Sequence, residues 1–317
     1  MILTRVTNKS MSNIIINNLL TNRSKLYELQ EQISSGKLVT KPSQNPANAM
    51  SILSDKSSLS QMENYIKNIE QVQSELEITD RSILSAVDVV HRARELTVQA
   101  SNMSSGSNEL SAINFEVEQL MNQVKDLGNT KYGSKYIFGG RVTEDAPFQE
   151  VGTNQIQYMG TLSTGNYQRE AEIVQGVKVP LNLAGDAVFG QYYESAPGPP
   201  PVMTGSGLIQ TLATLSQELQ TSPPNHDNIR SKIGDFENNL KTLLDSQAQI
   251  GGTISRLEMT KSKIEEDVIS YTKRKSKLED IDLAKSISNV QFQETALQAS
   301  LSVGSKVIQN SLLDYLG

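Results

Sequence analysis

Hydrophobic residues near both ends of the chain recur at alternating steps of three and four positions, which is the spacing of a coiled-coil seam. Near the N-terminus this series comprises Ile15, Leu19, Asn22, Leu26, Leu29 and Ile33. Gly36 follows the series, and glycine commonly ends a helix. Pro46 suits a first helical turn. The pattern therefore predicts one helix that ends at Gly36 and a second that begins near Pro46.

Longer series of the same spacing lie further along the chain. The second helix is predicted from Leu59, Met62, Ile66, Ile69, Leu76, Ile83, Val87 and Val90. A third helix is expected from Leu110 to Gly128, and helix returns over 208–219. The longest series runs from Ile229 to Leu278. The last segment carries on one face Val290, Leu297, Leu301, Ile308 and Leu312.

The middle of the chain changes to short alternating runs bounded by glycine, which predict strands. We expect a β insertion there, with the proline-rich run 197–201 at its exit. The predicted fold is mainly α with a mid-chain β insertion, an elongated helical bundle whose N- and C-terminal helices pair as a coiled coil. The expected domains are terminal segments 1–45 and 283–317, a helical bundle 46–140 and 206–282, and the β insertion 141–205.

The two terminal stripes are the thinnest in the chain. At about 25 cal/mol per Å² of buried apolar area, two such helices do not repay their ordering entropy. We expect these ends to fray in the isolated chain and to order when neighbouring subunits pack on them. The stripes of the middle helices are interpreted as intramolecular core. The predicted subunit-contact residues are Ile15, Leu19, Leu26, Leu29, Ile33, Leu297, Leu301, Ile308 and Leu312.

Composition narrows the possible functions. Aromatic residues make up 5% of the chain, and tryptophan and cysteine are absent. This composition is lean for an enzyme with an apolar pocket, and it removes disulfides and thiolate metal sites. The net charge of −6 does not favour nucleic acid, which needs a clustered basic face. No apolar run is long enough for a membrane span, and the polar start predicts no signal peptide.

Few residues suggest catalytic chemistry. His91 and His226 lie far apart, and neither has a metal-ligand spacing. Asp280 and Asp282 could be paired carboxylates, but we favour a helix cap, where negative charge meets the positive end of the helix dipole. The segment 204–208 lacks the full motif of a phosphate loop and is interpreted as an ordinary loop. No catalytic, cofactor-binding or metal-binding residue is predicted.

The two ends of the chain differ in charge. Near the N-terminus the basic residues exceed the acidic ones, with Arg5, Lys9, Arg23, Lys25, Lys37 and Lys41 against Glu28 and Glu31. Near the C-terminus the acidic residues exceed the basic ones, with Asp280, Asp282, Glu294 and Asp314 against Lys285 and Lys306. Opposite charge can steer pairing and register, although each exposed pair contributes only about 0–1 kcal/mol.

Several motifs resemble one family. Residues 33–49, Ile-Ser-Ser-Gly-Lys-Leu-Val-Thr-Lys-Pro-Ser-Gln-Asn-Pro-Ala-Asn-Ala, resemble a signature of flagellins and their hook-associated relatives. Residues 251–258, Gly-Gly-Thr-Ile-Ser-Arg-Leu-Glu, are similar to its counterpart on the returning helix. Tyr136-Ile-Phe-Gly-Gly with Ala146-Pro-Phe, and the C-terminal residues 296–316, resemble the hook–filament junction proteins (the FlgL type) of the flagellin superfamily.

This resemblance implies a structural adaptor that links the hook-associated ring to the flagellin filament. The implied partners are flagellin, the first hook-associated protein, copies of the same chain in a ring, an export chaperone and the flagellar type III export apparatus. The implied location is outside the cell, at the hook–filament junction, with no nucleic acid, membrane insertion or cofactor. The family often has acidic residues where Gln44 and Asn45 stand, which affects any salt bridge from that loop.

Two alternatives remain at this point. A filament flagellin would share the terminal helices and would polymerise alone into long filaments. A cytosolic coiled-coil adaptor would share the heptads but would have no reason for the β insertion. An enzyme is the least favoured class, because no acid–base or metal constellation stands out.

Overall fold

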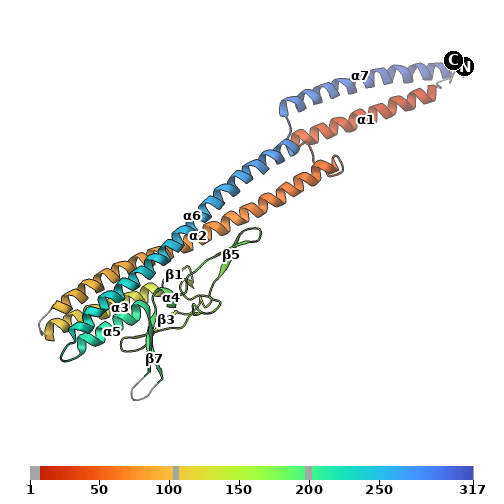
Figure 1. Cartoon of the computed structure of the whole chain (residues 1–317). Helices are drawn as coiled ribbons and strands as arrows, with labels where there is room; N and C mark the ends of the chain where they lie inside the picture. The colour runs from red at the N-terminus through yellow and green to blue at the C-terminus, as the bar shows by residue number, and fades with distance from the viewer. Residues whose placement is uncertain (1–7, 103–106, 197–201, 317) are drawn as a thin grey trace. The chain divides into compact units, whose positions relative to one another are not determined.

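The computed structural model describes residues 8–102, 107–196 and 202–316. The chain is mainly helical with a small β region, as predicted, and Figure 1 shows the order of its elements. The helices are α1 (Asn8–Ser35), α2 (Pro46–Asn102), α3 (Ser107–Gly128), α4 (Gly185–Val188), α5 (Gly207–Gln220), α6 (His226–Glu279) and α7 (Leu283–Leu316). The strands are β1 (Lys131–Tyr132), β2 (Lys135–Tyr136), β3 (Phe148–Gly152), β4 (Gln155–Tyr158), β5 (Glu170–Val174), β6 (Val177–Pro180), β7 (Gln191–Ala196) and β8 (Val202–Ser206).

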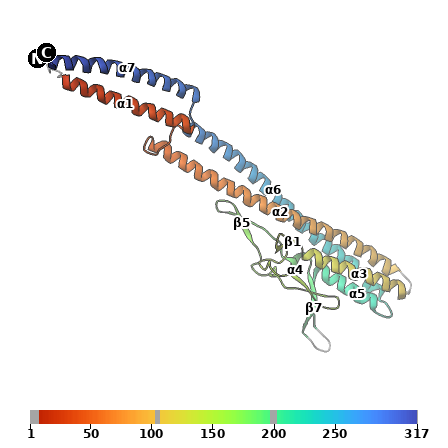
Figure 2. The same cartoon turned by 180° about the vertical axis from the view of Figure 1, so that it is seen from behind.

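The chain forms two compact units. The central unit is residues 62–264, and the terminal unit consists of the chain on either side of that range. In the terminal unit α1 and α7 lie side by side in both views (Figures 1 and 2). The predicted limits of the first helices are confirmed, because α1 ends before Gly36 at a φ of +71° and α2 begins at Pro46. The predicted domain limits themselves stay a prediction.

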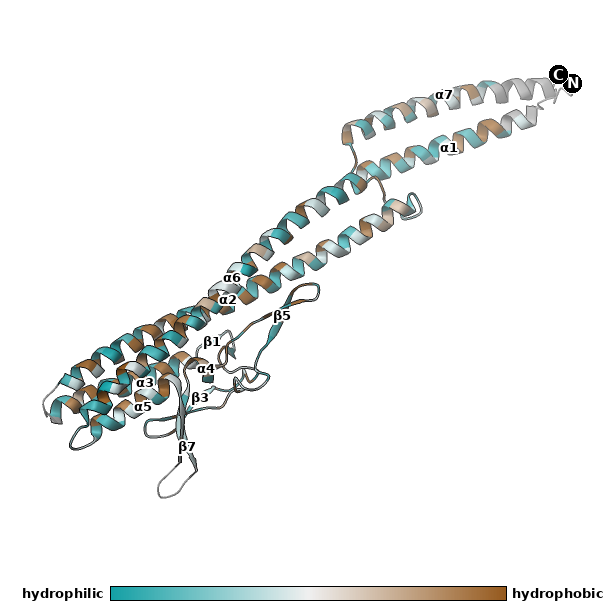
Figure 3. Cartoon of the chain, in the orientation of Figure 1, coloured by the Kyte–Doolittle hydropathy of each residue, from teal (hydrophilic) through white to brown (hydrophobic). Residues whose placement is uncertain are grey.

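The central unit contains a bundle of helices with a closed apolar core. Hydrophobic and polar residues alternate along its helices (Figure 3). Most of the apolar positions predicted from the heptads are buried, including Ile83 on α2, Val117 on α3, Leu212 on α5 and Phe236 on α6. This confirms the intramolecular interpretation of the middle stripes.

The β region lies between α3 and α5 in the sequence. Its main sheet has the order β3-β4-β7-β8 and is antiparallel throughout, while β1 with β2 and β5 with β6 form separate antiparallel pairs. Buried aromatic rings hold it together, since Phe138 and Phe189 meet edge to face at 4.8 Å between centroids. Strands extend from Lys131 to Ser206, compared with the predicted insertion 141–205.

One local expectation was wrong. The segment 204–208 is not a loop, because β8 includes Thr204 to Ser206 and α5 begins at Gly207. Residues 204–206 are small and have a weak strand propensity, but their pairing with β7, for example Thr204 with Tyr193, holds them in a strand. The proline-rich run 197–201 lies outside the described residues. Among the helices that the structure describes, none combines the length and apolarity of a membrane span.

Candidate assembly surface and its junction

Helices α1 and α7 contact each other in the terminal unit along a seam whose side chains on α1 are only half-buried. A Cβ placed on Gly304 of α7 would lie 3.1 Å from Ile15 Cγ2 and 3.8 Å from Leu19 Cδ1, so the two helices approach closely there. The Asn22 side-chain amide donates a hydrogen bond to Ser300 Oγ at 3.2 Å. Gln293 Nε2 donates to the Asn22 backbone carbonyl oxygen at 3.1 Å. Helix α1 therefore meets polar and small residues of α7.

The predicted subunit-contact residues differ in how far their side chains are exposed. Six are half-buried on α1 or α7, namely Ile15, Leu19, Leu26, Leu29, Ile33 and Leu297. Leu301 is 53% exposed. Ile308 and Leu312 belong to α7, but their side chains lie outside the described residues. Ile15 and Leu19 face α7 of the same chain, and the role of the set between subunits stays a prediction.

Several large apolar side chains on the same two helices are exposed. On α1 these are Ile14, Ile16, Leu20 and Tyr27, and on α7 they are Leu283, Ile287, Phe292, Leu301 and Val303. Phe292 is 74% exposed and Leu20 is 60% exposed. Sequence reasoning missed most of them because they lie beside the heptad series. The run Ile14-Ile15-Ile16 was the available signal, since three consecutive residues cannot all face one seam.

Two helix breaks meet at a junction within the terminal unit. The loop between α1 and α2 and the short link between α6 and α7 run past each other as an isolated antiparallel bridge. Leu38 N–H donates to the Glu279 carbonyl oxygen at 2.6 Å, and Ile281 N–H donates to the Gly36 carbonyl oxygen at 3.2 Å. The two breaks are therefore tied through the backbone.

A buried carboxylate adds charge pairing at this junction. Glu279 Oε1 lies 2.8 Å from both Lys37 Nζ and Lys56 Nζ, and its side chain is 6% exposed. Burial alone raises the pKa of Glu279, but hydrogen bonds from the two lysines outweigh it and hold the pKa below its usual range. Nearby, Arg274 pairs with buried Asp55, and its hydrogen bonds lower the pKa of that carboxyl.

The amides at positions 44 and 45 serve the same loop. Gln44 Oε1 accepts from the Thr40 backbone N–H at 2.9 Å and closes the turn. Asn45 Oδ1 accepts from the Asn48 backbone N–H at 3.0 Å and caps α2. Hydrogen-bond acceptance thus needs no carboxylate here. At the other break the predicted cap is confirmed for Asp282, whose Oδ1 accepts from the Lys285 backbone N–H at 3.1 Å, whereas Asp280 accepts from the Ser276 hydroxyl at the end of α6.

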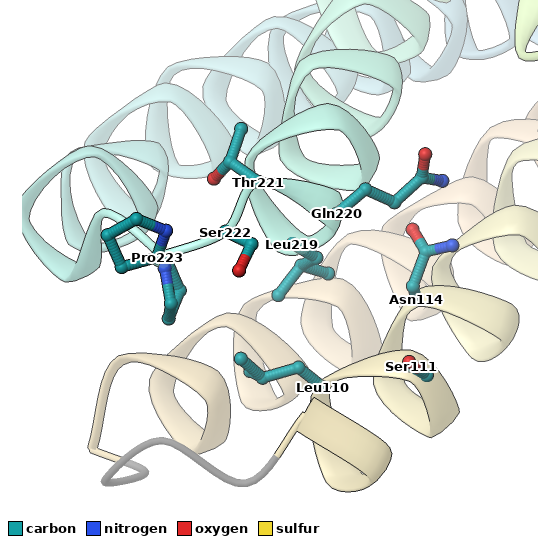
Figure 4. A pocket seen from close by; sticks show the side chains of 9 residues that line it. Leu110, Ser111, Asn114, Leu219, Gln220, Thr221, Ser222 and Pro223 are labelled. Carbon is teal, nitrogen blue, oxygen red and sulfur yellow. The ribbon is translucent and has the colours of Figure 1, made fainter.

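The central unit offers little for catalysis. His91 is exposed on α2, and His226 is the first residue of α6. Within the described ranges no group of three or more His, Cys, Asp or Glu residues could hold a metal ion. A pocket of about 480 Å³ lies at the ends of α3 and α5 (Figure 4). Among the described residues, those that line it carry no titratable side chain; they are Leu110, Ser111, Asn114, Leu219, Gln220, Thr221, Ser222, Pro223 and Pro224.

The paired terminal helices, the exposed apolar side chains on them and the mid-chain β region are features of a helical structural protein. Residues 6–143 match the family model for the bacterial flagellin N-terminal helical region, and residues 227–316 match the model for the C-terminal helical region. Together the two models span more than two thirds of the sequence. The chain belongs to the flagellin family.

Individual relatives agree with this assignment. The chain is 25% identical to flagellar hook-associated protein 3 of Escherichia coli over 85% of its own length and 86% of the relative. It is 21% identical to a flagellin of Bacillus subtilis over 94% of its length and 95% of the relative. A flagellar hook-associated protein structure from Vibrio parahaemolyticus has the same fold, with a TM-score of 0.64 and 15% identity over 75% of this chain and all of that chain.

Proposed function

We propose that this chain is the structural adaptor that joins the hook-associated ring of the bacterial flagellum to the flagellin filament, and that it polymerises through α1 and α7. One observation carries the proposal: both terminal helices expose large apolar side chains, while their shared seam is shallow. Exposed apolar area of this kind marks an interaction surface. Phe292, Leu20 and Leu301 are therefore the side chains we assign to subunit contacts.

The energetic argument concerns where the terminal helices gain their stability. Isolated helices are marginal in water, and most helical stability comes from packing an apolar face. Within the chain, α1 and α7 bury only part of that face. Contact with neighbouring subunits would remove the rest from water, at about 25 cal/mol per Å² of apolar area. Assembly and ordering of the chain ends are then one coupled process.

The finer assignments rest on the family. The partners we propose are copies of the same chain in a ring, the first hook-associated protein on one side and flagellin on the other. Export would pass through the flagellar type III apparatus with an export chaperone, to a location outside the cell. The absence of cysteine agrees with passage of an unfolded chain, because no disulfide can form on the way.

A filament flagellin is the second candidate, favoured by the match to the Bacillus subtilis protein. The identity to the hook-associated relative is higher, which favours the adaptor. The two candidates differ in behaviour, since a flagellin grows into long filaments by itself. The family assignment and the β region disfavour a cytosolic coiled-coil adaptor.

The test compares exposed apolar residues in the two units. One variant combines Leu20→Ser with Phe292→Ser, and its matched control combines Met259→Ser with Phe115→Ser, which are 67% and 64% exposed in the central unit. Incorporation is measured by co-sedimentation of purified chain with isolated hook preparations and flagellin, and by motility of cells that depend on the variant. Circular dichroism verifies that each variant folds.

We expect the terminal variant to lose incorporation by about tenfold or more, the scale of a small hot spot, while the control retains it. Deleting residues 1–45 or 283–317 is expected to abolish assembly and to leave the central unit folded. Equal incorporation of variant and control would contradict the adaptor proposal. Growth of the chain alone into long filaments would favour flagellin.

A further inference from the structure

We propose that Asn22 and Gly304 act together as a register device, which allows α1 and α7 to pair in one alignment only. Asn22 is the polar member of an otherwise apolar heptad series on α1. It meets α7 at two residues one heptad apart, as a donor to Ser300 Oγ at 3.2 Å and as an acceptor from Gln293 Nε2 through its Oδ1 at 3.3 Å. All three side chains are half-buried.

A single amide in an apolar seam specifies alignment at the expense of stability, because a shifted partner leaves the amide without hydrogen bonds. Charge does not fix the alignment here. Among the described residues of α1 and α7, no ion pair joins the two helices, despite the opposite charge balances of the chain ends. Among the described residues, the hydrogen bonds of Asn22 supply directional contacts between α1 and α7.

Gly304 supplies the second constraint. It is buried under Ile15 and Leu19, and a Cβ at its position would already stand 3.1 Å from Ile15 Cγ2. A shift of one heptad in one direction would place Leu297 at that position, where its side chain has no room. A shift in the opposite direction would place Val307 where Ser300 accepts from Asn22. Only the observed alignment satisfies both positions.

The alignment has a consequence for the outer surface. The alignment determines which exposed apolar residues of α1 lie next to which exposed apolar residues of α7. It therefore sets the composition of the surface that neighbouring subunits would contact. This consequence rests on the proposed function, whereas the register device itself does not. A test on the isolated chain therefore separates the two proposals.

The absence of cysteine makes alignment directly measurable. Asn18 and Val303 line one groove between α1 and α7, so Asn18→Cys with Val303→Cys reports the observed alignment. Asn18→Cys with Ala296→Cys, or with Asn310→Cys, reports a shift of one heptad in either direction. Disulfide yield under a glutathione redox buffer is compared for the three pairs in the full-length chain.

In the otherwise unchanged chain we expect the disulfide only at the Val303 position. Asn22→Leu should raise the shifted disulfides about fivefold, the scale of one net hydrogen bond in the pairing equilibrium. The matched control is Asn17→Leu, an exposed asparagine of α1, which should change nothing. A second route removes the partners instead, with Ser300→Ala and Gln293→Ala, and should also raise the shifted pairs.

Equal yields at the three positions in the unchanged chain would overturn the register device. The proposal would also be overturned if both Asn22→Leu and the variant Ser300→Ala with Gln293→Ala kept the single alignment. Because the measurement needs no hook or flagellin, it stands whether or not the adaptor proposal holds.

Discussion

The two units share the same heptad spacing, but the side chains at the heptad positions are buried to different extents. In the central unit Phe236, Leu243 and Leu257 on α6 are fully buried. In the terminal unit no described side chain of α1 is fully buried. The difference lies in the partner face, because α7 presents Gln293, Ser300 and Gly304 to α1. Periodicity therefore specifies which face of a helix is turned inward, while the chemistry of the opposing helix decides how much that face stabilises the fold.

The largest expected contrast is in hydrogen exchange. Backbone amides of α2 and α6 in the central unit should exchange only through global unfolding, with an opening free energy of about 5–15 kcal/mol. Those of α1 and α7 should open locally at a much lower free energy of a few kcal/mol, so that the two helices pair in the isolated chain but are weakly protected. Exchange monitored by mass spectrometry, with limited proteolysis as a parallel measurement, checks this. Equal protection in the two units would show that the terminal seam is self-sufficient.

The second contrast is a pair of truncations. Phe236→Ala removes a fully buried ring and should lower the free energy of unfolding of the central unit by about 3–5 kcal/mol. Leu26→Ala in the half-buried seam should leave that transition unchanged, because its side chain belongs to the terminal unit. Urea denaturation followed by circular dichroism measures both. A comparable loss from Leu26→Ala would mean that the two units unfold as one.

The junction should respond to pH and to loss of one carboxylate. The pKa values of Glu279 and Asp55 lie below their ordinary range in the folded chain. Their stabilising contribution is therefore complete above the ordinary carboxyl pKa of about 4, and it is lost as the pH falls through the folded values. We therefore expect the junction to become more susceptible to proteolysis as the pH falls from 7 to 3, and limited proteolysis at several pH values measures this.

Glu279→Gln keeps the shape of the side chain but removes the charge that two lysines share. We expect a loss of about 1–2 kcal/mol at pH 7, since both lysines are half-exposed and solvent screens the pairs. The variant should also show a smaller change on acidification than the unaltered chain. An unchanged acid response in Glu279→Gln would assign that response to other carboxyls.

The smallest expected effect is at the cap of α2. Asn45→Ala removes the acceptor for the Asn48 backbone N–H and should lower stability by about 1 kcal/mol. Asn45→Asp, the kind of residue that the family often places there, should be close to neutral because it caps equally well. Thermal unfolding of the two variants separates capping from charge, and a large gain from aspartate would point to charge.

Local signals were predictable from the sequence, and contacts between distant segments were not. Gly36, Pro46 and Asp282 act on their own backbone, so their positions predicted helix ends and a cap. The strand through Thr204 depends on its pairing with β7, which no local pattern encodes. The same holds for Glu279 and Lys56, which are 223 residues apart in the sequence. Exposed residues such as Phe292 were missed because a heptad count selects only the seam.

The junction has a mechanical consequence. Both covalent paths through the terminal unit leave helical geometry at the same place, one after α1 and the other before α7. Twist applied along the chain would concentrate at such a point if the two breaks could slide independently. The crossed bonds of Leu38 and Ile281, with the shared carboxylate of Glu279, make the two backbones deform as a pair. We therefore expect a twist applied to α1 and α7 to be shared between the two backbones at this junction.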